Sequence, residues 1–243
     1  MKGEKDCREL FNHWKNHIEV AGKPNEWEVK ELMREAGLPV PEDFILKTGK
    51  SLTGDSVPGV HPPYAVKLCS ADVLHKSDVG GVVLGVSEEG LPGVVKDLRQ
   101  RFPGEHLLIS EMVPIRGPEF IIGALSDPVF GPAVMAGAGG VLAELYKDVA
   151  FRLAPCTLAE AGRMLEELTI APVLKGFRGS SMDIESLKEI ITLFSYLSAA
   201  ATIEGADLDI NPLVWNGEKW VVLDGKAVLT SGEEEGAPTV GFS

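Results

Sequence analysis

The stretch from Tyr64 to Gly85, YAVKLCSADVLHKSDVGGVVLG, places a strand pattern, a polar loop and a second strand pattern in direct succession. Its β-branched and aromatic residues predict strands over 64–68 and 82–86. A lysine inside a strand, Lys67, costs desolvation free energy unless its ammonium meets a partner, which favours a position facing a site. The loop sets a histidine, His75, beside a second lysine and ends in paired glycines, which reach backbone angles that other residues avoid. The stretch therefore indicates a fixed cation beside a mobile imidazole.

Composition favours a globular protein with a sizeable core. The chain has 243 residues and 44% hydrophobic content, enough for one large or two small domains. Its 27 glycines and 16 prolines are typical of a turn-rich α+β or α/β protein. The formal net charge of −13 argues against a nucleic-acid partner, because phosphate backbones need clustered Lys and Arg. The charge is compatible with a nucleotide, since a few local cations and a metal ion can reverse the field inside a cleft.

The remaining compositional signals predict a cytoplasmic protein. Three cysteines, Cys7, Cys69 and Cys156, lie far apart without CxxC spacing, which argues against a zinc site and a disulfide framework. The first residues, MKGEKDCREL, lack the apolar core of a signal peptide. The most apolar helical pattern, 190–203, is too short and too interrupted by Ser and Thr to span a bilayer. We therefore expect neither export nor a membrane partner.

Hydrophobic periodicity and end signals place the other elements. Asn25 with Glu28 and Thr157 with Glu160 match a capping box, and Asp183 is a candidate N-cap. The expected helices span 6–21, 25–37, 92–102, 157–168 and 183–204. The expected further strands span 40–46, 107–109, 119–125 and 132–136, followed by a terminal hairpin of 206–215 and 219–229.

The terminal hairpin carries a candidate metal site. Asp209 and Asn211 are two residues apart on a strand, so both side chains point to one face. A two-residue loop would place Asp224 opposite Asp209, and a four-residue loop would place it opposite Asn211. Either register gathers three oxygen-bearing side chains on one surface, a donor set that suits Mg²⁺. The alternative is the polar outer face of an ordinary hairpin.

Other candidate residues have two interpretations from spacing alone. Glu111 and Glu119 flank a predicted crossover, and spacing alone favours two surface carboxylates over a site. The run Gly137–Gly140 lacks the Lys-Ser/Thr of a P-loop and the GxGxxG order of a dinucleotide fold, so the pattern alone favours a tight turn over a phosphate loop. Lys67 could snorkel from an edge strand. His75 could be an exposed histidine, although neutral imidazole is a competent nucleophile near pH 7.

Four motifs, in order, resemble the ATP-grasp β subunits of ADP-forming acyl-CoA synthetases, a family related to the succinyl-CoA synthetase β subunit. They are AVKLCSADVLHKSDVGGV, EMVPIRGPEF, FGPAVMAGAGGVLAELYKDVAFRLAP and the pair DINPLV and LDGK. The resemblance covers about residues 25–230. It implies an α+β ATP-grasp fold whose two α/β lobes hold a Mg-nucleotide between them. The implied parts are a helical extension, two lobes and a flexible tail: 1–24, 25–110, 111–230 and 231–243.

The resemblance also implies roles for individual residues. His75 would carry the phosphoryl group, and Asp209 would lie near the metal and the incoming phosphohistidine, as the two catalytic residues. Asn211 and Asp224 would bind Mg²⁺. Glu144 would lie near the cleft. The residues implied to contact ATP or ADP, through phosphates, adenine or ribose, are Lys67, Glu111, Met112, Val113, Glu119, Gly139 and Gly140.

By this resemblance the chain would be one subunit of an enzyme that converts acyl-CoA, ADP and phosphate to carboxylic acid, CoA and ATP. A separate CoA-binding α subunit would complete it, as an α₂β₂ assembly. Three alternatives are a ligase that forms an acyl phosphate directly, the regulatory ATP-grasp component of a split protein acetyltransferase, and a nucleotide-binding subunit without turnover. The sequence identifies neither the acid nor a preference for ADP over GDP.

Overall fold

The computed structural model describes residues 3–18, 23–52, 57–73, 76–140, 147–179 and 181–229. Contacts divide the chain into two compact units. We call residues 25–27 and 41–113 the small unit, and residues 1–24, 28–40 and 114–243 the large unit. The predicted lobes follow chain order, whereas the contacts group 28–40 with the second half of the chain. The predicted lobe bounds, 25–110 and 111–230, stay a prediction.

The small unit is an antiparallel sheet with one helix. Among the described residues the strand order is β1-β4-β2-β3. Apolar side chains of β2, β4 and the helix form its core, among them Val66, Leu98 and Ile109. The strands predicted at 64–68 and 82–86 are confirmed, while that predicted at 40–46 is confined to its last four residues. The elements are β1 (Asp43–Leu46), β2 (Tyr64–Cys69), β3 (Val82–Val86), α3 (Leu91–Arg101) and β4 (His106–Glu111).

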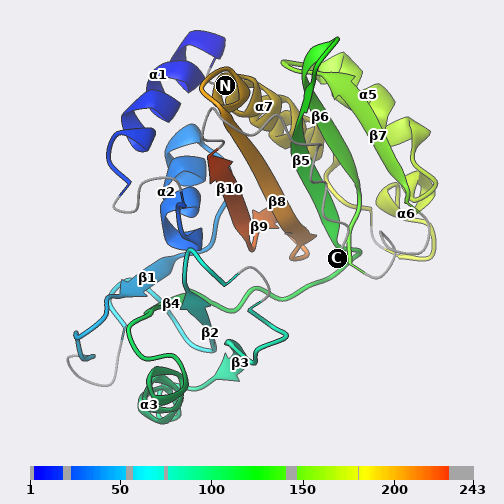
Figure 1. The fold of residues 1–243 in the computed structure, drawn as a ribbon. Coiled ribbons are helices and arrows are strands. Elements are labelled where there is room, and N and C mark those ends of the chain that lie inside the picture. The colour runs from blue at the N-terminus through cyan, green and yellow to red at the C-terminus, as the bar shows by residue number, and fades with distance from the viewer. Residues whose placement is uncertain are drawn as a thin grey trace. The chain divides into compact units, whose positions relative to one another are not determined.

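The large unit is a wider antiparallel sheet covered by helices. In the described part of the chain the strand order is β10-β8-β5-β6-β7, with β9 paired to β8. Figure 1 shows α5 and α7 on one side of this sheet. The strands are β5 (Phe120–Asp127), β6 (Gly131–Ala138), β7 (Val149–Leu153), β8 (Ala206–Trp215), β9 (Trp220–Val222) and β10 (Gly225–Leu229). The helices are α1 (Glu4–Lys15), α2 (Glu26–Ala36, whose residues 28–36 belong here), α5 (Leu158–Glu167), α6 (Ala171–Leu174) and α7 (Ile184–Ile203).

The core of the large unit fills the space between the sheet and its helices. Alternate residues of β5 point into it because successive side chains of a strand face opposite sides. Phe120 and Ile122 therefore pack against the apolar stripe of α7, which includes Leu187, Ile191 and Phe194. The opposite face of β5 carries Ile121 and Gly123, and the candidate site of the large unit lies on this second face.

The helix ends predicted at Thr157, Asp183 and Gly37 agree with the structure, whereas the end of the first helix does not. Thr157 caps α5 with the reciprocal bonds to Glu160, and the Asp183 carboxylate caps α7 by accepting from the Ser186 amide at 3.0 Å. Gly37 follows α2 with φ +102°, a left-handed conformation that favours glycine. The helix predicted at 6–21 ends at Lys15, and its last three positions, 19–21, lie outside the described residues, as does the tail. In the described part of the chain, no helix is both long enough and apolar enough to cross a membrane.

Candidate functional site

In the small unit, Lys67 has the buried partner that a lysine in a strand requires. Its Nζ donates to Oε1 of Glu26, the first residue of α2, at 2.7 Å. Lys76 Nζ donates to the other oxygen of the same carboxylate at 2.5 Å. The Glu26 side chain is only 1% exposed, and those of Lys67 and Lys76 are 12% and 8% exposed. One carboxylate thus holds the strand lysine and the lysine that follows His75.

His75 itself lies outside the described residues, together with Leu74. The chain resumes at Lys76 in a turn whose backbone is closed by a bond from the Gly81 amide to the Lys76 carbonyl at 2.7 Å. A Cβ at Gly81 would lie 3.0 Å from that carbonyl oxygen and from the Leu68 side chain. Gly81 therefore lets the backbone of the turn approach β2 closely. The freedom of movement expected of the paired glycines stays a prediction.

The predicted adenine segment begins at the end of β4. Glu111 pairs with Tyr64 across the sheet, and its carboxylate accepts from the His61 amide at 3.2 Å. The Met112 amide donates to the Pro63 carbonyl at 2.9 Å, and Val113 is partly buried. The amide of Met112 is thus engaged within the small unit, so an adenine contact here would use other backbone groups.

In the large unit, the structure brings Glu119 together with the glycine-rich segment at the end of β6. The Gly139 amide donates to the Glu119 carbonyl at 2.7 Å. A Cβ on Gly140 would lie 2.7 Å from Glu119 Oε2, and one on Gly139 would lie 3.1 Å from the Glu119 carbonyl carbon. Absent side chains therefore allow this backbone to pass directly over Glu119. Glu144 lies outside the described residues.

The hairpin adopts one of the two registers considered from the sequence. Trp215 pairs with Trp220, so the loop between them has four residues. The Asn211 amide donates to the Asp224 carbonyl at 3.1 Å, and Asp209 pairs with Lys226 two positions along. Asp224 therefore lies opposite Asn211, on the same face as Asp209.

Burial and two neighbouring charges perturb Asp209. The pKa of this carboxyl is raised to about 6, mainly because burial removes it from water, while Lys226 lowers the pKa and the Asp224 carboxylate raises it. Gly123 pairs with Asp209 across the sheet, and a Cβ there would lie 3.4 Å from Asp209 Oδ1. The carboxylate thus lies against strand backbone that carries no side chain.

The donor set of Asp209, Asn211 and Asp224 fits Mg²⁺. Two carboxylates near one another leave an excess of negative charge that a hard cation neutralises, and an amide oxygen is a further hard ligand. In the described ranges, groups of three or more His, Cys, Asp or Glu able to hold a metal do not occur. The two carboxylates and one amide of Asp209, Asn211 and Asp224 suit an ion that completes its coordination shell with water and phosphate oxygens.

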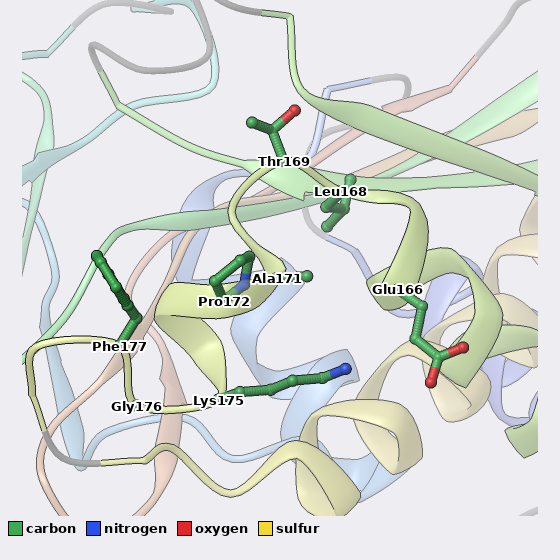
Figure 2. A pocket seen from close by; sticks show the side chains of 8 residues that line it. All are labelled: Glu166, Leu168, Thr169, Ala171, Pro172, Lys175, Gly176 and Phe177. Carbon is green, nitrogen blue, oxygen red and sulfur yellow. The ribbon is translucent and has the colours of Figure 1, made fainter.

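A surface cavity of about 690 Å³ lies elsewhere in the large unit, around α6. Figure 2 shows the side chains of Glu166, Lys175 and Phe177 around it. None of the predicted site residues lines it, so the cavity and the candidate site are separate features.

Sequence reasoning missed four residues that the structure places at the site: Glu26, Lys76, Gly123 and Lys226. Glu26 fell within the helix predicted at 25–37 and was given no role, and its partners are 41 and 50 residues away along the chain. Gly123 and Lys226 become visible once the strand register is known, because both pair with Asp209. A buried strand lysine predicts that a partner exists and does not say which residue it is.

Comparison with known proteins identifies the fold and its relatives. The family model described as an ATP-grasp domain matches residues 19–229. The chain is 34% identical over 213 residues to the β subunit of ADP-forming acetate–CoA ligase I of Pyrococcus furiosus, covering 84% of this chain and 90% of that one. It is 39% identical over 180 residues to ADP-forming acetate–CoA ligase I of Archaeoglobus fulgidus, covering 71% of this chain and 26% of that longer one.

A solved structure agrees over nearly the whole chain. It is dinucleotide-forming acetyl-coenzyme A synthetase 1 of Ca. Korarchaeum cryptofilum, bound to coenzyme A and Mg-AMPPCP, with its phosphohistidine segment pointing towards the nucleotide binding site. The match has 31% identity and a TM-score of 0.75, and covers 92% of this chain and 100% of that one. The chain therefore belongs to the ATP-grasp family, alongside the β subunits of ADP-forming acetate–CoA ligases.

Proposed function

We propose that this chain is the nucleotide-binding β subunit of an ADP-forming acyl-CoA synthetase, in which His75 passes a phosphoryl group to ADP. The observation that carries the proposal is the arrangement in the small unit. Lys67 and Lys76, the neighbour of His75, donate to the same Glu26 carboxylate at 2.7 and 2.5 Å. A phosphate-binding lysine and the base of a phosphohistidine loop are thereby held together. The relatives named above support the same activity.

In the proposed step, an oxygen of the ADP β-phosphate attacks phosphorus on phospho-His75. The P–N bond breaks as the new P–O bond forms, and its electron pair goes to the ring nitrogen; a proton on the other ring nitrogen of phospho-His75 leaves a neutral imidazole beside ATP. Catalysis of such a transfer is mainly positioning and neutralisation of phosphate charge. The Lys67 ammonium supplies positive charge to the α and β phosphates. Gly139 and Gly140 lack side chains where the backbone crosses Glu119, so the backbone itself can approach the phosphates there; the Gly139 amide is bonded to the Glu119 carbonyl, which leaves the Gly140 amide as the donor.

Asn211 and Asp224 would hold Mg²⁺, which supplies charge neutralisation at the phosphate oxygens when bound. Asp209, whose pKa is raised to about 6, lies beside them on the same face and would respond to both the metal and the approaching imidazole. Glu119 would accept the ribose hydroxyls, and Glu111, Met112 and Val113 would border the adenine.

The partner we propose is a CoA-binding α subunit, in an α₂β₂ assembly. The Pyrococcus relative is named as one subunit of its enzyme, and the chain spans 90% of it. The Archaeoglobus relative is about four times as long as the matched part, so further domains accompany the ATP-grasp part in that protein. The acid would be bound by those other domains, so the partner subunit would determine which acid is used.

Phosphoryl labelling tests the proposal. The chain is incubated with γ-³²P-ATP and Mg²⁺, with and without a candidate α subunit, beside His75→Ala and a matched control, His61→Ala, which changes an exposed histidine of the same unit. We expect acid-labile, base-stable label on the wild type and the control and none on His75→Ala. Binding of Mg-ATP without label, even with the α subunit, would refute the phosphohistidine mechanism and leave a regulatory or non-catalytic nucleotide-binding role.

A further inference from the structure

Glu26 joins two cations that come from different parts of the small unit. Lys67 lies on β2, and Lys76 begins the turn that leads to β3. Both ammonium groups donate to the Glu26 carboxylate, whose side chain is almost fully buried. Ion pairs removed from water are rigid in geometry, because leaving either charge without its partner is strongly unfavourable. The end of the His75 loop is therefore fixed to α2 through one side chain.

The rest of that turn is held by backbone contacts. The Gly80 amide donates to the Ser77 carbonyl at 3.0 Å and the Gly81 amide to the Lys76 carbonyl at 2.7 Å. The Arg101 guanidinium of α3 donates to the carbonyls of Val79 and Gly80, at 2.8 and 2.9 Å. The segment from 76 to 81 is thus anchored at both its ends, by Glu26 at the first residue and by Arg101 near the last.

We propose that Glu26 is a positioning residue that anchors the His75 segment through Lys76 while it orients Lys67. The anchor fixes Lys76, the residue that follows His75 in the chain. It also couples Lys76 to the phosphate-binding lysine, since both donate to one carboxylate. The consequence for phosphoryl transfer rests on the proposed function, whereas the anchor itself does not.

Hydrogen exchange read by mass spectrometry tests the anchor directly. The comparison uses Glu26→Gln, which keeps the shape and removes the charge, and Lys76→Met, which leaves the Lys67–Glu26 pair in place. Matched controls are Glu35→Gln, on the exposed side of the same helix, and Lys96→Met, at an exposed position of α3. We expect exchange of the Gly80 and Gly81 amides to rise at least tenfold in both test variants and in neither control. In the double variant, Glu26→Gln with Lys76→Met, these amides should exchange no faster than in the faster of the two single variants.

Unchanged exchange at these amides in Lys76→Met would overturn the anchor. Lys76→Met decides the question even where Glu26→Gln fails to fold, because only the former replaces a buried ammonium with an apolar chain of similar length.

Single-turnover labelling tests the consequence for transfer. With the assembled enzyme we expect both variants to label His75 at least tenfold more slowly than wild type, to the same final extent, with the Kd of Lys76→Met for Mg-ADP within twofold of wild type. A rise of more than fivefold in that Kd would make Lys76 a nucleotide ligand and overturn the positioning role. Absence of label on the wild type would instead refute the proposed function, and the exchange result would still decide the anchor.

Discussion

Substitution of Gly140 by alanine separates backbone strain from loss of a ligand contact. Gly140 has φ +58°, and an alanine Cβ there would lie 2.7 Å from Glu119 Oε2. That oxygen is the end of a flexible side chain, so we expect the carboxylate to move while the backbone stays in place. Gly131 is a matched control in the same unit, because it has φ +82° and open space where a Cβ would be.

Both variants should lose similar stability. The left-handed conformation costs a non-glycine residue about 1–2 kcal/mol. Reduced freedom of the unfolded chain offsets about 0.4–1 kcal/mol of this. We therefore expect each variant to lower the free energy of unfolding by about 1 kcal/mol in urea titrations.

Nucleotide affinity should separate the two variants. A hydrogen bond to a charged group is worth about 1.5–3 kcal/mol, so displacing Glu119 from the ribose hydroxyl that we propose it binds should weaken Mg-ADP binding roughly thirtyfold. Isothermal titration should show this loss for Gly140→Ala and for Glu119→Gln, with Gly131→Ala near wild type. Equal affinities of the two glycine variants would refute the reasoning. So would normal binding by Glu119→Gln beside weak binding by Gly140→Ala, because the effect would then arise in the backbone.

Three further predictions concern residues of the large unit. Thr157→Ala removes the cap of α5 and should lower the free energy of unfolding by about 1 kcal/mol in urea titrations, with an unchanged m-value. Gly137→Ala should cost at least about 2 kcal/mol in the same assay, because its Cβ would lie 2.2 Å from the Asp148 carbonyl oxygen and force β6 and β7 apart. Cys156 is 1% exposed and burial raises the pKa of its thiol, so Ellman's reagent at pH 8 should modify it only after unfolding; rapid reaction of the native protein would contradict this environment.

Local signals predicted most of the elements. The capping box at Thr157, the cap at Asp183 and the glycine after α2 each act through bonds between near neighbours, so the sequence alone carries them. The ATP-grasp fold followed from motifs, and the family match confirms it.

The strand β7 was missed, and its environment explains why. Its Phe151 and Leu153 are exposed, so the segment lacks a clear buried face, and an edge strand is defined mainly by its pairing with β6. That pairing joins Ala136 to Ala150 and depends on the intervening residues, so the pattern within five residues could not reveal it.

The hairpin register shows the limit of spacing arguments. The sequence left two loop lengths open, and the choice between them decides whether Asp224 faces Asp209 or Asn211. The structure has the four-residue loop, whose Asn216 side chain accepts from the amides of Glu218 and Lys219 at 2.9 and 2.8 Å. Bonds to one asparagine side chain therefore stabilise the loop that determines which of these oxygen-bearing side chains are neighbours.

The two halves of the candidate site are built by different physical means. In the small unit, positions of the cations depend on charge, since Lys67 and Lys76 converge on Glu26. In the large unit, positions of the oxygen ligands depend on backbone register and on missing side chains, as at Gly123 and Gly140. Variants that remove a charge without changing shape should therefore impair the first half most. Addition of a single methyl group at Gly140 should impair the second, because a Cβ there would lie 2.7 Å from Glu119 Oε2 while every charge is retained.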